Sequence, residues 1–404
     1  MNKSHYFLSR MLLLITATFS HGFIHASSLP SNDLIQPSMP NSAPLITPAP
    51  PTLNAKAYIL IDVDSGKIIA EKNSEERLPP ASLTKMMTLY VISNALRNEQ
   101  IHLTDSVRIS QEAWKIGGSR MFVKEGQQVS VEDLLKGIIV DSGNDACVAM
   151  AEHLGSSESG FTELMNNQAK NLGMTNSHFT DSTGLPDKEH YTSAKDLAIL
   201  GRALINDFPQ YYHWYKQKWF TFNGIRQPNR NRLLWRDNQV DGVKTGHTNE
   251  AGFCLVSSAK RENMRLLAVV LNSPTDTARA DDSERLINYG FRFFETHALY
   301  KSGSKIAEVP LYKGQVNTIP VGLVADQFIT IPAGQYSRLT INTKIPKFVE
   351  APLKKGDKLG ELIIKFDGSI IGNYPVYALQ NAETGGFFTR GKDTVKLLFK
   401  RWFS

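Results

Sequence analysis

Three short motifs carry most of the chemistry in this 404-residue sequence. Ser82 and Lys85 are three positions apart, so on a helix they lie on one face, one turn apart. A serine hydroxyl beside an amine base suits nucleophilic catalysis, provided that burial or a second cation lowers the pKa of the lysine. Two further motifs follow, Ser142-Gly143-Asn144 and Lys244-Thr245-Gly246. Each motif alone is uninformative, but their order and spacing predict a serine acyl-transfer site.

The second motif contributes polar groups that can move a proton and bind a carbonyl. Ser142 lies in a Gly-containing turn and can relay a proton between Lys85, a leaving amine and Lys244. The amide of Asn144 can donate to a substrate carbonyl and accept from a lysine. We therefore predict catalytic roles for Ser82, Lys85, Ser142 and Asn144.

The third motif ends a strand-like run and is predicted to bind the substrate. Gly246 would let a substrate backbone approach the sheet edge closely, while Lys244 and Thr245 would hold a terminal carboxylate. The backbone N–H groups of Ser82 and His247 are candidate donors to an oxyanion. For the side chain of His247 the alternative is a purely structural role, which is the usual role of a lone histidine.

Strand-like segments both precede and follow a helical middle region. Helices are expected over 82–97, 144–153, 161–172, 197–205 and 277–294, and Ser130 with Asp133 opens another. Strands are expected over 57–62, 67–70, 219–222, 240–245, 253–258 and 265–271. Because consecutive late strands follow the helices, the pattern predicts an α+β domain, with an antiparallel sheet covered by helices, over 55–298.

The C-terminal quarter differs in composition. Residues 299–381 contain short β-rich runs cut by Gly, Pro and Asp-Gly, which predicts a small all-β domain. Residues 382–404 predict an amphipathic helix whose apolar face comprises Phe388, Val395, Leu398, Phe399 and Trp402. The other side is basic, with Arg390, Lys396, Lys400 and Arg401, and Leu397 is misplaced among these residues. We expect this helix to lie in an anionic membrane surface; the alternative is packing against the β domain.

The N-terminal end has the pattern of an export signal. Lys3 and Arg10 precede the apolar run 11–23, and small residues follow it, so 1–28 is predicted to be a signal peptide. The alternative, an uncleaved membrane anchor, is disfavoured because the run is short and interrupted. Residues 29–54 are rich in Pro, Ser and Asn and are predicted to be a linker, with folding expected to begin near Ala55.

Composition narrows the classes of function. The net charge of +6 is mild and no long Lys/Arg block occurs, so nucleic acid is not an expected partner. The ten histidines are scattered without metal-ligand spacing, and we predict no metal and no cofactor. Cys147 and Cys254 are expected to be two unlinked buried thiols.

The sequence around the motifs resembles that of a known family, the exported D-alanyl-D-alanine carboxypeptidases of the low-molecular-mass penicillin-binding proteins. The similar segments are Pro-Pro-Ala-Ser-Leu-Thr-Lys-Met-Met-Thr (79–88), Ser-Gly-Asn-Asp-Ala (142–146) and Gly-Val-Lys-Thr-Gly-His-Thr (242–248). The resemblance extends through the β domain and the tail. It implies a β-lactamase/transpeptidase-like fold and a basic residue, Arg279, near the substrate carboxylate.

The resemblance also implies the reaction. Ser82 would attack the penultimate D-Ala carbonyl of a peptidoglycan stem peptide and release the terminal D-Ala, with β-lactams as covalent inhibitors. The protein would lie at the periplasmic face of the inner membrane, attached by its C-terminal helix. The alternatives are a D,D-endopeptidase, a transpeptidase, a weak β-lactamase or a non-catalytic wall-binding homologue. Glu189 and His190, in the region where class A β-lactamases carry a catalytic Glu, are expected to be solvated loop residues. The oligomeric state stays open.

Overall fold

The computed structural model describes residues 47–402, with side chains described as far as residue 399. The predicted signal peptide, 1–28, and most of the predicted linker lie outside these residues. The described end of that linker is packed against the fold. The Tyr289 hydroxyl donates to the Pro48 carbonyl at 2.8 Å, and the Asn54 amide donates to Asp282 at 3.0 Å. Leu53 is buried, so the packed chain begins several residues before Ala55.

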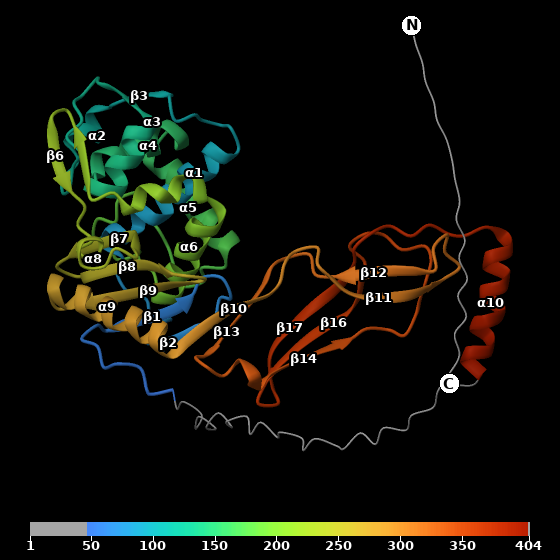
Figure 1. The fold of residues 1–404 in the computed structure, drawn as a ribbon. Coiled ribbons are helices and arrows are strands. Elements are labelled where there is room, and N and C mark those ends of the chain that lie inside the picture. Colours follow the sequence, from blue (N-terminus) through green and yellow to red (C-terminus); the bar gives the residue numbers. More distant parts are fainter. Residues whose placement is uncertain (1–46, 403–404) are drawn as a thin grey trace, which may run out of the picture. The chain divides into compact units, whose positions relative to one another are not determined.

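A five-stranded sheet forms the centre of the first domain (Figure 1). Every neighbouring pair in it is antiparallel, as the sequence predicts. In spatial order its strands are β2 (Ile68–Lys72), β1 (Ala57–Asp62), β9 (Met264–Ser273), β8 (Gly252–Arg261) and β7 (Val240–Thr248). The predicted strand at 219–222 lies outside this sheet; it is β5 (Trp219–Phe222), paired with β6 (Ile225–Pro228).

Strands β1 and β9, in the middle of the sheet, are buried on both faces, and both are apolar on both sides. In β1, Ile59 and Ile61 belong to one hydrophobic core, whereas Tyr58 and Leu60 belong to another. This division follows from the alternation of side chains along a strand. Helix α9 (Asp276–Phe293) contributes to the second core. The first core is built with α1 (Lys85–Arg97), α3 (Val131–Lys136), α4 (Asn144–Gly155), α5 (Glu158–Leu172) and α6 (Ala194–Asp207).

The helix starts follow capping chemistry. The hydroxyls of Ser130 and Ser193 accept hydrogen bonds from the backbone amides of Asp133 and Asp196, at 3.1 Å in both cases. One predicted helix is divided: residues 81–84 form a 3₁₀ turn, η1 (Ala81–Thr84), and α1 begins only at Lys85. Ser82 therefore lies on the tighter turn at the entrance to α1.

Shorter elements connect these helices and strands. They are β3 (Ser106–Arg108), α2 (Gln111–Lys115), β4 (Gln128–Ser130), η2 (Gly137–Asp141), α7 (Pro209–Tyr212), η3 (His213–Lys216) and α8 (Leu233–Arg236). The segment η2 is a π-helical turn between α3 and α4, and the Ser142 motif follows it directly.

The C-terminal region is built from strands, as predicted. The strand β10 (Phe294–Tyr300) pairs with β13 (Gln327–Pro332), and it begins before residue 299, the predicted start of the domain. A second sheet has the order β14 (Leu339–Lys344), β16 (Lys358–Phe366), β17 (Ser369–Ala378), β12 (Thr318–Gly322), β11 (Lys305–Tyr312) and β15 (Val349–Glu350). Its core is a small cluster of aliphatic side chains. A short 3₁₀ turn, η4 (Tyr336–Arg338), precedes β14.

The last element is the helix α10 (Phe387–Trp402). Its Asp393 carboxylate accepts a hydrogen bond from the Lys313 backbone amide at 2.7 Å, and Leu397 is buried. Leu397, which the sequence analysis placed among the basic residues, therefore lies on a side of the helix that is covered. In contrast, Phe388 and Phe399 are 90% and 62% exposed. Among the helices of the described residues, none combines the length and the apolar character needed to cross a bilayer.

Candidate active site

Ser82 and Lys85 are in hydrogen-bond contact at the start of α1. The Lys85 Nζ lies 2.9 Å from Ser82 Oγ and 2.7 Å from the carbonyl oxygen of Thr183. The lysine side chain is fully buried. Burial lowers the pKa of Lys85, and the nearby Arg230 acts in the same direction against the opposing effects of acidic neighbours. A buried amine of this kind can accept the proton of the serine hydroxyl.

Lys244 and Ser142 form a second amine–hydroxyl pair. The Lys244 Nζ donates to Ser142 Oγ at 2.9 Å and to the Thr245 carbonyl at 3.0 Å. Ser142 adopts a left-handed conformation, with φ of 59°, in the turn between η2 and α4. Burial lowers the pKa of Lys244 well below its usual range, and the charges of Lys85 and Arg230 lower it further. The second and third motifs thus meet through Lys244 and Ser142. Beyond the effect of burial, however, the cation that lowers the pKa of Lys85 is Arg230 rather than the expected Lys244.

Asn144 organises the wall of the site. Its Nδ2 donates to the Gly117 carbonyl at 2.7 Å, and its backbone amide donates to the Ser119 carbonyl at 2.7 Å. Gly118 and Ser119 line the cavity in front of Ser82. Asn144 therefore fixes the loop that forms one side of the cavity.

The cavity itself has a volume of about 470 Å³. It brings together residues that are far apart in the sequence: Ser82, Gly118, Ser119, Ser142, Arg230, Thr245, Gly246, His247, Phe253 and Arg279. Five of the six predicted residues in this set come from η1, the Ser142 turn and β7. The sixth, Arg279, comes from α9.

Gly246 has a different role from the predicted one. A Cβ at this position would lie 2.8 Å from the Pro80 carbonyl oxygen and 3.2 Å from the Ser82 amide nitrogen. The absence of a side chain therefore allows β7 to pack closely against η1, next to the nucleophile. We expected the glycine to allow the approach of a substrate backbone, but the side it leaves open is already filled by protein.

Arg279 is buried and held by backbone carbonyls. Its Nη1 donates to the carbonyls of Gly246 and Cys254, at 3.1 and 3.2 Å, and its guanidinium pairs with Asp276. Burial lowers the pKa of Arg279, although the nearby Asp276 opposes this. The His247 ring stacks on Phe253, with 4.0 Å between the ring centroids. A fixed cation thus lines the cavity beside β7.

Comparison with known sequences identifies the protein family of this chain. The family described as D-alanyl-D-alanine carboxypeptidase matches residues 45–275, more than half of the chain. The family described as penicillin-binding protein 5, C-terminal domain, matches residues 294–384. The chain belongs to the D-alanyl-D-alanine carboxypeptidase family.

Individual relatives agree with this assignment. The D-alanyl-D-alanine carboxypeptidase DacC of Escherichia coli (strain K12) is 45% identical over 361 residues, which cover 87% of this chain and 90% of the relative. Penicillin-binding protein 5 from Haemophilus influenzae has a similar structure, with a TM-score of 0.79 and 43% identity over 83% of this chain and 99% of that one. The fold is therefore that of a penicillin-binding carboxypeptidase followed by its β-rich domain.

Several residues of the candidate site lie outside the sequence motifs. Arg230 and Phe253 line the cavity, but neither belongs to a pattern that would have indicated it. His190 was expected to be solvated, and this was wrong: it is 3% exposed, and its Nε2 lies 2.8 Å from Thr84 Oγ1. Glu189 is exposed, as expected. Because His190 directly follows the exposed Glu189, the local sequence does not indicate that His190 is buried.

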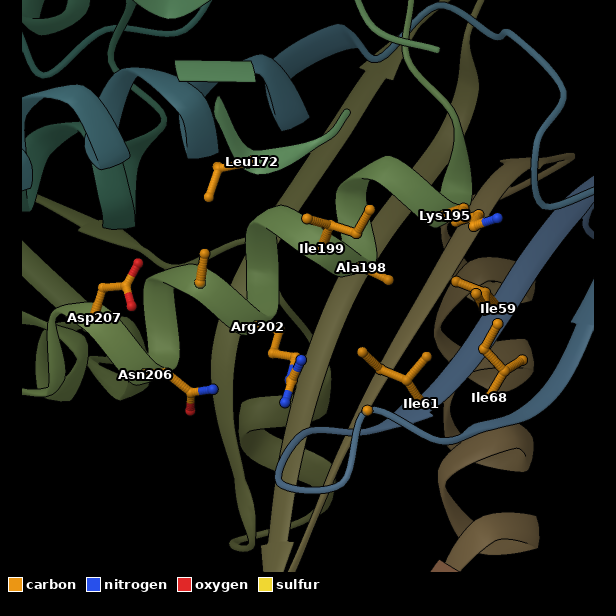
Figure 2. A pocket seen from close by; sticks show the side chains of 12 residues that line it. Ile59, Ile61, Ile68, Leu172, Lys195, Ala198, Ile199, Arg202, Asn206 and Asp207 are labelled. Carbon is orange, nitrogen blue, oxygen red and sulfur yellow. The ribbon is translucent and has the colours of Figure 1, made fainter. Parts of the chain in front are cut away.

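A second cavity, of about 490 Å³, lies between α6 and the β1–β2 hairpin (Figure 2). Its lining is mainly aliphatic, and it contains no serine, cysteine or histidine. The guanidinium of Arg202 is held by the carbonyls of Val63 and Asp64, at 2.6 and 3.2 Å. This cavity therefore offers no serine or cysteine nucleophile, whereas the cavity around Ser82 does.

Proposed function

We propose that this protein is a serine D,D-carboxypeptidase that removes the terminal D-alanine from peptidoglycan stem pentapeptides through an acyl-enzyme. The observation that carries the proposal is the 2.9 Å contact between the buried Lys85 amine and the Ser82 hydroxyl, at the edge of a cavity that contains Arg279. Membership of the D-alanyl-D-alanine carboxypeptidase family supports the same reaction.

Acylation begins with the transfer of a proton. Neutral Lys85 accepts the proton of Ser82 Oγ as this oxygen forms a bond to the carbonyl carbon of the penultimate D-Ala. The backbone amides of Ser82 and His247 are the proposed donors to the oxyanion. The bond to the terminal D-Ala nitrogen then breaks. The proton that Lys85 took from Ser82 passes through Ser142, which Lys244 holds at 2.9 Å, to the leaving amine, so Lys85 is neutral again.

Deacylation uses water to break the ester. Water adds to the acyl carbon, Ser82 Oγ regains its proton, and the shortened peptide leaves with a new carboxylate. Because Lys85 stays within hydrogen-bond distance of Ser82 Oγ, it can also serve as the base for this step.

Specificity for a chain end follows from the charge at the cavity. Arg279 lines the cavity as a buried cation, and Lys244 and Thr245 lie on the adjoining strand. A free terminal carboxylate complements these groups, whereas an internal peptide bond does not. This charge complementarity suits the removal of a residue with a free carboxylate, as the carboxypeptidase reaction requires.

Inhibition by β-lactams is part of the proposal. Penicillin-binding protein D2 of Listeria monocytogenes has solved structures described as ampicillin-bound and cefotaxime-bound, and the ampicillin form is 29% identical to this chain with a TM-score of 0.55. We expect penicillin to acylate Ser82 in the same cavity. Intact-mass spectrometry of wild-type protein and Ser82→Ala after incubation with penicillin tests this directly. An adduct on the wild type alone supports the proposal, and equal adducts on both proteins contradict the role of Ser82.

The helix α10 supports a proposal about location. Phe387, Phe388, Leu398 and Phe399 are strongly exposed, and basic residues of the same helix are exposed as well. Such a helix suits the surface of an anionic membrane. Together with the predicted export signal, this supports a location at the periplasmic face of the inner membrane. Stem peptides of the wall and the membrane surface are then its partners.

Vesicle sedimentation tests the membrane contact. We expect the mature protein to sediment with vesicles that contain anionic lipid and to be released by salt or by Phe388→Glu. Asn381→Glu, which adds the same charge at an exposed position before α10, is the matched control and should still sediment. Equal binding of all three proteins would contradict the role of α10.

A further inference from the structure

Two carboxylates hold the turn beside the nucleophile. Glu158 Oε1 accepts hydrogen bonds from the Ser182 amide at 3.0 Å and the Ser182 hydroxyl at 2.7 Å, and Asp181 holds the next two residues. Oδ1 of Asp181 accepts hydrogen bonds from the Thr183 amide at 2.6 Å, the Thr183 hydroxyl at 2.7 Å and the Gly184 amide at 2.7 Å. The Thr183 carbonyl of the same turn accepts the hydrogen bond from Lys85 at 2.7 Å. Of the two carboxylates, Asp181 is the one that binds Thr183 itself, so it directly positions the acceptor for the Lys85 amine.

The other carboxylate oxygen of Asp181 contacts a buried histidine. His190 Nδ1 lies 3.3 Å from Asp181 Oδ2 and 3.0 Å from Thr180 Oγ1. Its Nε2 lies 2.8 Å from the hydroxyl of Thr84, the residue before Lys85. The ring also packs edge-on against Phe179. His190 thus joins the turn to the start of α1.

The turn has little room to move relative to η1. Gly184 has a φ of +87°, and a Cβ there would lie 1.8 Å from the Ala81 carbonyl oxygen, next to Ser82. The Ser182 carbonyl accepts a hydrogen bond from Thr88 of α1 at 2.6 Å. A displacement of this turn would therefore be transmitted to the nucleophile and its base.

We propose that Asp181 and His190 are positioning residues that hold the Thr183 carbonyl, and through it Lys85, in the geometry needed for acylation. Asp181 fixes the turn, and His190 connects it to Thr84. The inference rests on the proposed function, because it assigns Lys85 the role of the base for Ser82. Neither residue contacts the substrate in this account.

The charge of Asp181 has a second, separable effect. Burial lowers the pKa of Lys85, and the negative charge of Asp181 partly opposes this shift. Cys147 and Asp145 also face Lys85 and act in the same direction as Asp181, whereas Arg230 acts against them. Replacing the carboxylate should therefore make Lys85 easier to deprotonate.

The rate of acylation by penicillin, measured against pH, tests the proposal. We expect Asp181→Ala to lose about 10²-fold in rate at the optimum pH, since a base misplaced by about 1 Å costs this much. Asp181→Asn should recover part of the loss, because its amide oxygen can still accept from Thr183. Its acid limb should move to lower pH. His190→Gln should also slow acylation. Asp187→Asn, in the same loop but exposed, is the control and should keep the wild-type rate and profile.

Thermal unfolding of each variant separates positioning from general destabilisation. Variants of Asp181 that acylate at the wild-type rate would overturn the inference. So would a loss of rate that is fully matched by unfolding, with the acid limb of Asp181→Asn unmoved. A wild-type protein that penicillin does not acylate would overturn the proposed function as well, and this outcome is distinct from the others.

Discussion

Gly246→Ala is predicted to damage catalysis through the packing of β7 against η1. The added Cβ would lie 2.8 Å from the Pro80 carbonyl oxygen, about 0.6 Å closer than the shortest ordinary contact of 3.4 Å. The Ser82 amide at 3.2 Å is also too close, so β7 and η1 must separate by several tenths of an ångström. Because a misplacement of about 1 Å costs on the order of 10²-fold in rate, half of that should cost about tenfold.

The assay is stopped-flow acylation by a penicillin, with far-UV circular dichroism and thermal unfolding to check the fold. We expect a loss of about tenfold in the acylation rate and a fall in melting temperature of only a few degrees, corresponding to about 1–2 kcal/mol. Gly386→Ala is the control, since its Cβ would meet open space. A folded Gly246→Ala protein that acylates at the wild-type rate would refute the packing argument.

Four further predictions follow from the site. The acylation rate should rise with pH as Lys85 loses its proton. Because burial lowers the pKa of this amine, the rate should reach half its maximum at a pH below the ordinary lysine pKa of about 10.4. A midpoint at or above about 10.4 would contradict the role of Lys85 as the base. Arg279→Gln should lower kcat/KM about 10- to 100-fold for a peptide with a free terminal carboxylate, because one charge-assisted hydrogen bond contributes about 1.5–3 kcal/mol. For a peptide with an amidated C-terminus, kcat/KM should change little. Burial raises the pKa of the Asp141 carboxyl to about 7, and the nearby Asp145 raises it further. Because this pKa is higher in the folded than in the unfolded protein, the folded state loses stability as the pH rises and Asp141 ionises. Asp141→Asn cannot ionise, so its gain in melting temperature over the wild type should grow between about pH 5 and pH 8. Burial also raises the pKa of the Cys147 thiol to about 12, so an alkylating reagent at pH 8 should label this unlinked cysteine only after unfolding.

The motifs were predictable because their chemistry depends on residue type and local spacing. Ser82 and Lys85 are one helical turn apart, and the structure places their side chains 2.9 Å from each other. The Lys244–Ser142 contact joins positions 102 residues apart, yet the motif order indicated it. The antiparallel sheet was predictable too, since alternating and apolar runs define its strands.

The remaining parts depend on long-range packing, which local patterns do not encode. Arg230 enters the cavity from an irregular segment, and His190 is buried because Thr84 and Asp181 meet it from elsewhere in the chain. Gly246 is needed because the Pro80 carbonyl packs against it, and this contact depends on the tertiary fold. A single sequence indicates which residues can carry the chemistry, but it does not show which residues from elsewhere in the chain surround them.

Release of D-alanine from a peptide that ends in D-Ala-D-Ala tests the central claim most directly. The mature wild-type protein and Ser82→Ala should be compared at equal concentration, after both are shown to be folded. We predict release by the wild type and none above background by Ser82→Ala. No release by the folded wild-type protein, or equal release by both proteins, would contradict the assignment of a serine D,D-carboxypeptidase.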